Sequence, residues 1–111
     1  MRRTFIYASA AALLVGGALM NAAQAGKAGT AAKGKEVFEQ CSVCHNVDTD
    51  EKKIGPSLKG LFKRDKLKNG KKVTDANVLA VINAGGGGMP AYSDTLSDQE
   101  KSDVIAYLKT L

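Results

Sequence analysis

The feature that most constrains this chain is a cluster of sulfur and imidazole groups within five consecutive residues. The sequence contains two cysteines and one histidine, and all three belong to the segment Cys41-Ser42-Val43-Cys44-His45. In such a C-x-x-C-H segment, two thiols can add across the vinyl groups of one porphyrin edge, and the imidazole that follows can bind the iron. The segment therefore predicts one haem c, attached covalently through Cys41 and Cys44, with His45 as an axial iron ligand.

Three other uses of the same residues are disfavoured. A structural zinc site needs four ligands, whereas the cysteines and the histidine supply only three. A thioredoxin-type redox pair is expected within a βαβ unit, and the pattern of this chain is mainly helical. A disulfide between Cys41 and Cys44 can form in an oxidising compartment, but it leaves His45 without a role.

Residues 1–25 have the pattern of a cleaved secretory signal. The basic start Met1-Arg2-Arg3 is followed by an apolar stretch from Ala8 to Met20 and by the small-residue site Ala23-Gln24-Ala25. A retained membrane anchor is the weaker interpretation, because a spanning helix needs about 20 apolar residues. The arginine pair also resembles a twin-arginine signal, which is disfavoured because that route exports folded proteins. We expect a periplasmic bacterial protein without a membrane span, in which residues 33–111 form one small domain.

Met89 is the candidate for the second axial iron ligand. Met1 and Met20 lie in the predicted signal, so Met89 is the one thioether of the mature chain. Four glycines precede it and Pro90 follows it. Such a segment permits positive φ and close approach to a flat ring, but it is a poor scaffold for core packing. A His45–Met89 pair would saturate the iron, raise its reduction potential and favour outer-sphere electron transfer over substrate chemistry.

The first helix is expected to carry the C-x-x-C-H segment on one face. Residues 26–32 are small and polar and are predicted to form a flexible N-terminus. From Lys33 onwards, small and apolar residues recur at helical spacings of three and four. The residues on this face are Gly34, Val37, Phe38, Cys41 and Cys44.

Two further helices are predicted from their capping residues. Thr74 or Asp75 can cap a helix that the glycine run at residues 85–88 ends. Ser97 and Glu100 have the spacing of a capping box, which predicts the start of the last helix. The chain is therefore expected to be mainly helical, with little or no sheet.

Few aromatic residues are available to fill a core. After removal of the signal they are Phe38, Phe62, Tyr92 and Tyr107, and the chain has no tryptophan. A porphyrin would therefore supply much of the buried volume, and we expect the apoprotein to fold poorly. Haem attachment would then follow export of the unfolded chain through the general secretory route.

Residues 33–111 resemble the class I c-type cytochromes, a family of small monohaem electron carriers. Gly34 and Phe38, with Tyr107 and Leu108 near the end, resemble the residues where that family's N- and C-terminal helices cross. The resemblance implies an all-α cytochrome c fold, with three to four helices wrapped around one covalently attached haem. The short periplasmic cytochromes of bacteria are the better match, because the chain lacks the tryptophan of mitochondrial members.

The same resemblance implies two further contacts with the haem site. The segment from Gly55 to Phe62 is similar to the family's segment behind the proximal histidine, and the carbonyl of Pro56 would accept the other ring N–H of His45. Arg64 is similar to the residue that contacts a haem propionate in mitochondrial-type members. Its alternative is an ordinary solvated charge.

Charge is unevenly distributed along the mature chain. Loss of Arg2 and Arg3 lowers the net charge from +5 to +3, which is too mild to indicate nucleic-acid binding. Between Lys52 and Lys72, nine basic residues stand against Asp65 alone, and we call this segment the basic lobe. Its charge predicts redox protein partners with an acidic docking surface. The alternative is a lysine-rich loop that merely aids solubility.

The predicted function is that of a soluble, monomeric, non-enzymatic carrier that transfers single electrons between respiratory or dehydrogenase partners. A haem-based sensor or gas-binding protein is the alternative if Met89 is easily displaced from the iron. A peroxidase would need an open distal face with an acid–base residue, and the chain has no second histidine. A haem subunit of a larger oxidoreductase would share the carrier's chemistry.

Overall fold

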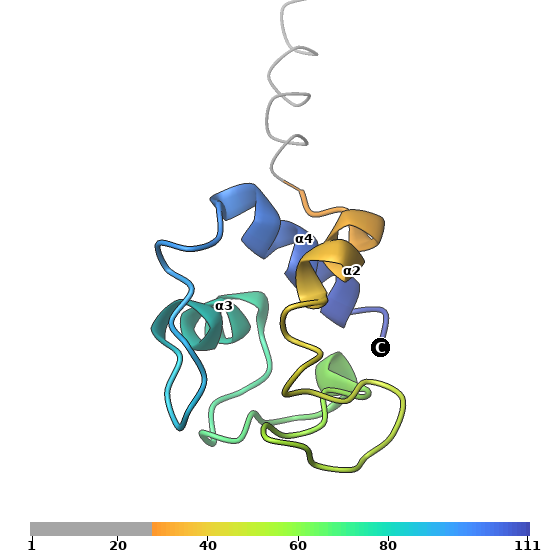
Figure 1. Ribbon diagram of the computed structural model, residues 1–111. Helices are drawn as coiled ribbons and strands as arrows, with labels where there is room; N and C mark the ends of the chain where they lie inside the picture. The colour runs from red at the N-terminus through yellow and green to blue at the C-terminus, as the bar shows by residue number, and fades with distance from the viewer. Residues whose placement is uncertain (1–27) are drawn as a thin grey trace, which may run out of the picture.

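The computed structural model describes residues 28–111, which contain three α-helices and one short 3-10 helix (Figure 1). The helices are α2 (Ala31–Phe38), η1 (Leu61–Lys63), α3 (Asp75–Ala84) and α4 (Asp98–Leu108). Within this described part, β-type pairing is limited to two isolated bridges, which confirms the predicted all-α fold. The predicted signal, residues 1–25, lies outside the described residues. No helix from residue 28 onwards is both long and apolar enough to cross a bilayer.

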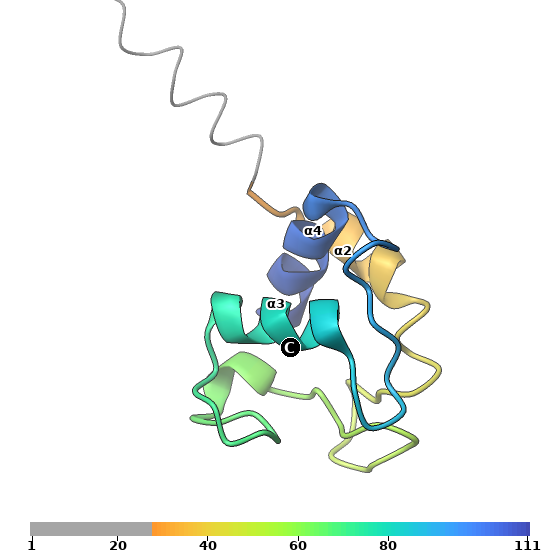
Figure 2. The same cartoon turned by 90° about the vertical axis from the view of Figure 1, so that its left-hand side faces the viewer.

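Helices α2 and α4 cross in close contact, as Figures 1 and 2 show. The contact depends on Gly34, because a Cβ atom there would overlap the backbone carbonyl of Asp103. Next to this point the rings of Phe38 and Tyr107 lie 5.3 Å apart at an angle of 52°, a favourable tilted arrangement. The predicted crossing of the two terminal helices is therefore present. Gly34 permits the close approach, and the two aromatic rings pack beside the crossing point.

The described part of the chain before Lys33 is hydrogen-bonded to α4, and the flexibility expected of residues 26–32 stays a prediction. Helix α2 begins at Ala31, and the Thr30 N–H donates to Oδ1 of Asp103 over 2.8 Å. The side-chain amide of Gln99 donates to the Ala28 carbonyl over 3.2 Å. Asp103 is buried, and a buried carboxylate requires such donors. The sequence pattern of residues 26–32 could not show this requirement, because Asp103 lies in the last helix.

The C-x-x-C-H segment follows α2 and does not continue it, which corrects the prediction of one helical face through Cys44. Helix α2 ends at Phe38. Beyond it the amides of Cys41 and Ser42 both donate to the Phe38 carbonyl, and the amides of Cys44 and His45 both donate to the Cys41 carbonyl. These paired bonds form two successive tight turns, so the thiols are presented by turns that lead away from the helix.

Both predicted caps are present. The Thr74 hydroxyl accepts the Asn77 N–H at the start of α3 (3.1 Å), and Gly85, with φ of 62°, follows the end of this helix. At the start of α4, the Ser97 hydroxyl accepts the Glu100 N–H (3.1 Å), while the Glu100 carboxylate accepts the Ser97 N–H (3.0 Å). These reciprocal bonds satisfy backbone donors that a helix start otherwise leaves unpaired.

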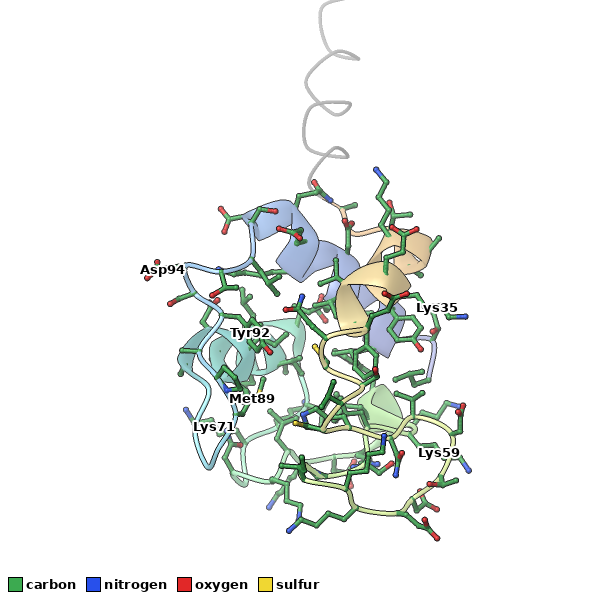
Figure 3. The ribbon with its side chains drawn as sticks, viewed as in Figure 1. Lys35, Lys59, Lys71, Met89, Tyr92 and Asp94 are labelled. Atoms are coloured by element: carbon green, nitrogen blue, oxygen red, sulfur yellow. The ribbon has the colours of Figure 1, made fainter. Side chains whose placement is uncertain are left out.

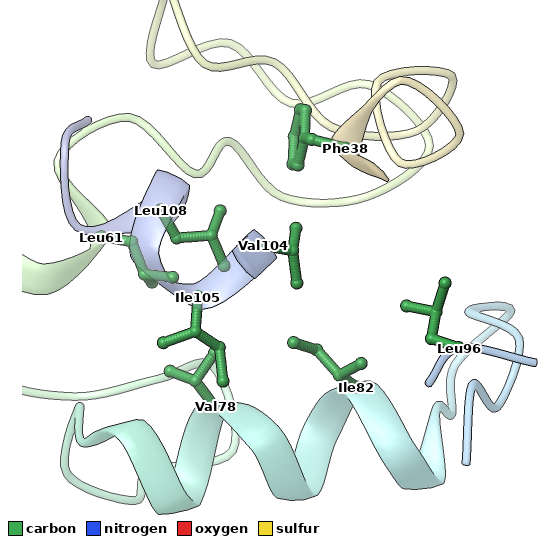
Figure 4. Close-up of a cluster of buried hydrophobic side chains, with 8 residues drawn as sticks. All are labelled: Phe38, Leu61, Val78, Ile82, Leu96, Val104, Ile105 and Leu108. Atoms are coloured by element: carbon green, nitrogen blue, oxygen red, sulfur yellow. The ribbon is translucent and has the colours of Figure 1, made fainter. Parts of the chain in front are cut away.

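The hydrophobic core is small and almost entirely aliphatic. Figure 4 shows its members, which come from α2, η1, α3, α4 and the segment before α4. They are Phe38, Leu61, Val78, Ile82, Leu96, Val104, Ile105 and Leu108. Phe38 is the one aromatic residue among them, so the described chain by itself offers little bulk to fill its centre.

Candidate haem site

An apolar cavity brings the C-x-x-C-H segment and Met89 together. Its wall includes Cys41 and His45 from the turns after α2, and Met89 and Tyr92 from the segment between α3 and α4. The remaining lining residues are Phe38, Leu58, Ile82, Leu96, Val104 and Leu108. A flat apolar ring with one metal at its centre suits this lining, which combines aliphatic walls with one thiol, one imidazole and one thioether. The residues therefore fit a haem.

The two cysteines carry free thiols and are half-buried. Burial, followed by the nearby Cys44, raises the pKa of the Cys41 thiol, so the thiol is protonated at neutral pH and is a weak nucleophile. In residues 28–111, no group of three or more histidine, cysteine, aspartate or glutamate side chains is arranged to hold a metal ion.

The imidazole of His45 is oriented by the segment that follows the motif. Its Nδ1 lies 2.7 Å from the carbonyl oxygen of Pro56. A carbonyl can only accept, so Nδ1 carries a proton, and in the neutral ring this leaves the lone pair on Nε2. This tautomer is the one that a metal ligated through Nε2 requires.

Gly55 is a site residue whose role the sequence analysis missed. A Cβ atom on Gly55 would lie 2.6 Å from Cε1 and 2.9 Å from Nδ1 of His45, so only glycine leaves room for the ring. The Gly55 N–H also donates to the Cys44 carbonyl over 2.8 Å. The sequence signal was a Gly-Pro pair a short distance after the motif, which the sequence analysis used only as part of a family resemblance.

Met89 follows a glycine turn whose conformation explains the glycine run. Gly86 and Met89 exchange two backbone hydrogen bonds of 2.9 and 3.0 Å. Gly87 and Gly88, between them, have φ of 61° and 95°, and positive φ at both central residues is typical of a type I′ turn. At Gly85 a Cβ atom would collide with the backbone of Pro90 at 2.6 Å. The glycines therefore reverse the chain so that Met89 returns towards the interior.

Tyr92 is a polar residue of the cavity wall to which the sequence analysis assigned no site role. Figure 3 shows Met89 and Tyr92 pointing from their segment towards the interior, whereas Asp94 points away. Burial, followed by Cys41 and Cys44, raises the pKa of the Tyr92 phenol. The phenol is therefore close to the motif and keeps its proton at neutral pH. Its position three residues after Met89 was the only sequence signal.

Arg64 is not among the cavity residues. Its guanidinium is exposed and donates from Nη2 to the Lys59 carbonyl over 2.6 Å. It borders a different hollow, together with Lys52, Ser57 and Lys68. The contact with a haem propionate remains a prediction.

Comparison with known proteins decides the family of the chain. The family model described as Cytochrome c matches residues 31–111. The chain belongs to the cytochrome c family. It is 32% identical to cytochrome c2 of Rhodomicrobium vannielii over 87% of this chain and 91% of the relative. It is 38% identical to cytochrome c6 of Synechocystis over 69% of this chain, and there it spans only 62% of the relative's length.

The fold of this cytochrome c also has solved counterparts. The structure of cytochrome c6 from the diatom Phaeodactylum tricornutum is similar, with a TM-score of 0.59 and 27% identity over 74% of this chain and 93% of the other. The cytochrome c family carries covalent haem c, and the two cysteines that attachment needs are present in this member. The predicted class I c-type cytochrome and its cofactor are confirmed.

Proposed function

We propose that this cytochrome c is a soluble carrier that passes single electrons between protein partners through a haem ligated by His45 and Met89. The observation that carries the proposal is the shared apolar cavity, which collects an imidazole with a free Nε2, the only mature thioether and the Cys41 thiol. When bound, the haem supplies an iron that gains or loses one electron without bond rearrangement.

The chain's own residues would prepare this site in three ways. Cys41 and Cys44 would hold the cofactor by covalent bonds on one edge. The Pro56 carbonyl would fix the His45 tautomer and strengthen it as a ligand. Aliphatic residues such as Leu58, Ile82 and Leu96 would exclude water from the two ligand bonds, and a soft thioether in a dry site favours the reduced iron.

The cavity also supports a carrier over a haem enzyme. A peroxidase needs an acid–base group beside an open iron face, yet none of the residues that line the cavity is an aspartate, glutamate or second histidine. The two acidic residues that follow Met89 most closely in the sequence, Asp94 and Asp98, are exposed. Saturation of the iron by Met89 would leave no position for substrate, which is why we propose no enzymatic activity.

We further propose that residues 1–25 direct export to the periplasm and are removed there. The basic start, the apolar stretch and the small-residue site in their sequence support this. Haem attachment would come after export, and two features support that order. The thiol of Cys41 has a raised pKa in the folded chain, which disfavours its addition to a vinyl group after compaction. The small aliphatic core would leave an apoprotein loose enough for export and for haem attachment afterwards.

The proposed partner is a redox protein with an acidic docking surface, which meets the basic lobe and the loop beside it. Val43 and Ile54 are large apolar residues that are 67% and 74% exposed. Their segments are joined by the bond from Lys53 Nζ to the Ser42 carbonyl (3.1 Å) and by the Gly55–Cys44 bond. The two exposed apolar residues therefore lie on adjoining segments at the attachment motif, with basic residues beside them. This arrangement suits a transient, electrostatically steered contact by a monomer.

The test of the carrier proposal is the weak sulfur-to-iron absorption band of the ferric holoprotein. We expect the band in the wild type and its loss in Met89→Ala, together with carbon monoxide binding to the ferrous form of the variant only. If the wild type lacks the band and binds carbon monoxide readily, the protein is a sensor or gas-binding protein and the carrier proposal is wrong.

A further inference from the structure

Lys101 is a buried lysine whose charge is compensated by the backbone of another segment. It lies on α4 and is 7% exposed, and buried ammonium groups require close polar partners. Its Nζ donates to the Ser93 carbonyl over 2.9 Å. The nearest carboxylate oxygen, on the exposed side chain of Asp98, is 4.0 Å away. The bond to Ser93 is therefore the principal compensation for the burial of this charge.

Ser93 belongs to the segment that presents Met89. We call residues 89–96 the Met89 strap, which leads from the glycine turn to the start of α4 (Figure 1). Two hydrogen bonds of the described structure tie the strap to the helices. One runs from the Tyr92 N–H to the Ile82 carbonyl of α3 (2.9 Å), and the other is the bond between Lys101 and Ser93.

Apart from Leu96 at its end, which is buried in the core, the strap has few other contacts that hold it in place. The bonds from the amides of Thr95 and Leu96 to the Tyr92 carbonyl lie within the strap. From Pro90 to Thr95 every residue except Tyr92 is exposed. A segment with few buried contacts opens at low free-energy cost, so each bond to a helix has a large share in its position.

We propose that Lys101 is a positioning residue that holds the Met89 strap on α4 and thereby keeps the Met89 thioether in the haem cavity. This inference rests on the proposed ligation by Met89. Loss of the Ser93 bond would leave the Tyr92–Ile82 bond as the one hydrogen bond between the strap and a helix, with Leu96 at the strap's end still buried. A larger fraction of molecules would then have Met89 withdrawn from the cavity. A competing ligand would then bind more tightly, in proportion to the fraction of withdrawn strap.

The experiment uses the ferric holoprotein and imidazole as the competing ligand. Lys101→Met keeps the apolar stem but removes the donor, and Lys101→Arg keeps a donor. The matched control is Lys109→Met at the other end of α4, because Lys109 binds Asp75 (2.7 Å) and lies over the Phe62 ring (5.6 Å), both away from the strap. Imidazole affinity, the sulfur-to-iron band and the melting temperature are measured for each protein.

We expect Lys101→Met to bind imidazole about tenfold more tightly than the wild type, the order of effect that loss of one charged hydrogen bond produces. Lys101→Arg, which keeps a donor, should have an imidazole affinity close to that of the wild type. Lys109→Met should melt at a lower temperature but bind imidazole as the wild type does.

The inference would be overturned if Lys101→Met bound imidazole no more tightly than the wild type. It would also be overturned if Lys101→Met and Lys109→Met gained the same imidazole affinity, because equal gains would reflect a general loss of stability and not a loss of the Ser93 bond. If Lys101→Met yields no holoprotein, Lys101→Gln is measured in the same way, because its amide is too short to replace the ammonium, and unchanged affinity again overturns the inference. Absence of the sulfur-to-iron band in the wild type would instead refute the ligation by Met89.

Discussion

The Pro56 carbonyl oxygen lies 2.7 Å from Nδ1 of His45, while the backbone of the neighbouring Gly55 lies against the same imidazole ring. The bond fixes which nitrogen carries the proton, and the glycine fixes where the ring can lie. Together they hold Nε2 free in the cavity that Met89 shares. Through these two contacts, Gly55 and Pro56 would influence how strongly His45 donates electrons to the proposed iron.

Gly55→Ala should disturb the histidine ligand directly. The added Cβ would lie 2.6 Å from Cε1 of the ring, so His45 must rotate and its bond to Pro56 must lengthen. We expect a lower free energy of unfolding by about 1–3 kcal/mol, as for other overpacked sites, and a shifted reduction potential. Thermal unfolding and potentiometric titration of the holoprotein measure the two effects.

Gly60→Ala is the matched control for this variant. Gly60 has φ of 65°, and no other part of the chain comes within 4 Å of the place where its Cβ would lie, so alanine there introduces backbone strain alone. It should lower stability by roughly 1 kcal/mol and leave the potential unchanged. A Gly55→Ala protein with the wild-type potential would contradict the role assigned to Gly55.

Asp103 should make stability depend on acid pH. The hydrogen bond from the Thr30 N–H, outweighing burial, lowers the pKa of this carboxyl below its ordinary value of 3.8. Because the folded-state pKa is the lower one, the stabilisation is fully present above the unfolded pKa and is lost as pH falls through the folded one. Denaturant unfolding of the wild type and Asp103→Asn, measured between neutral and acid pH, checks this.

The Asp103→Asn variant should be less stable than the wild type by about 1–2 kcal/mol at neutral pH, because charge-assisted bonds to Thr30 and Gln99 become neutral ones. The difference should shrink as the pH falls. A difference that stays constant, or grows, towards acid pH would show that Asp103 does not act through its charge.

Folding should require the haem. The described core has eight buried hydrophobic side chains and one aromatic ring among them, and the cavity of the C-x-x-C-H segment would stay unfilled. We expect Cys41→Ala/Cys44→Ala to lack a cooperative thermal transition in calorimetry, with helical circular dichroism well below that of the holoprotein. A compact double variant that melts cooperatively would refute the dependence.

Charge on the basic lobe should govern encounters with redox reagents. We expect oxidation of the reduced protein by the anion ferricyanide to slow as ionic strength rises, and oxidation by a cationic cobalt(III) complex to show the opposite trend.

Lys59→Glu, in the lobe, should reduce the ferricyanide rate at low salt more than Lys35→Glu on α2, which changes the net charge equally. Figure 3 shows these two lysines at separate places on the molecule. Equal effects of the two variants would mean that net charge alone decides the rate.

Local signals in the sequence predicted the fold well where a few adjacent residues decide the structure. The caps at Thr74 and Ser97 depend on side chains that bond to amides within one helical turn, so their spacing is sufficient to predict them. The Gly34 crossing was expected from the family resemblance, and it depends on the absence of a Cβ atom at that residue. That Cys41, His45 and Met89 share one cavity could be predicted because one haem needs a thiol for attachment and two axial ligands for its iron.

Interactions between distant segments could not be predicted in this way. At the start of α2, the Thr30 N–H bonds to Asp103 in the last helix. At its end, the chain turns after Phe38, although the spacing of apolar residues is equally compatible with a longer helix. The hydrogen bond from Lys101 to Ser93 depends on burial of a lysine, whereas a lysine in sequence indicates an exposed position. Tyr92 enters the cavity because the glycine turn redirects the chain, and its residue type alone gives no sign of this.

The most direct test of the proposed ligation labels the methionine methyl group with carbon-13 in protein matured by a haem-attaching bacterial host. Met89 is the only methionine of residues 26–111, so the mature protein should give one methyl signal. The account predicts that in the ferrous protein this signal is shifted far upfield by the ring current of a porphyrin directly beneath the thioether. A single methyl signal at the position of an ordinary exposed methionine would contradict it.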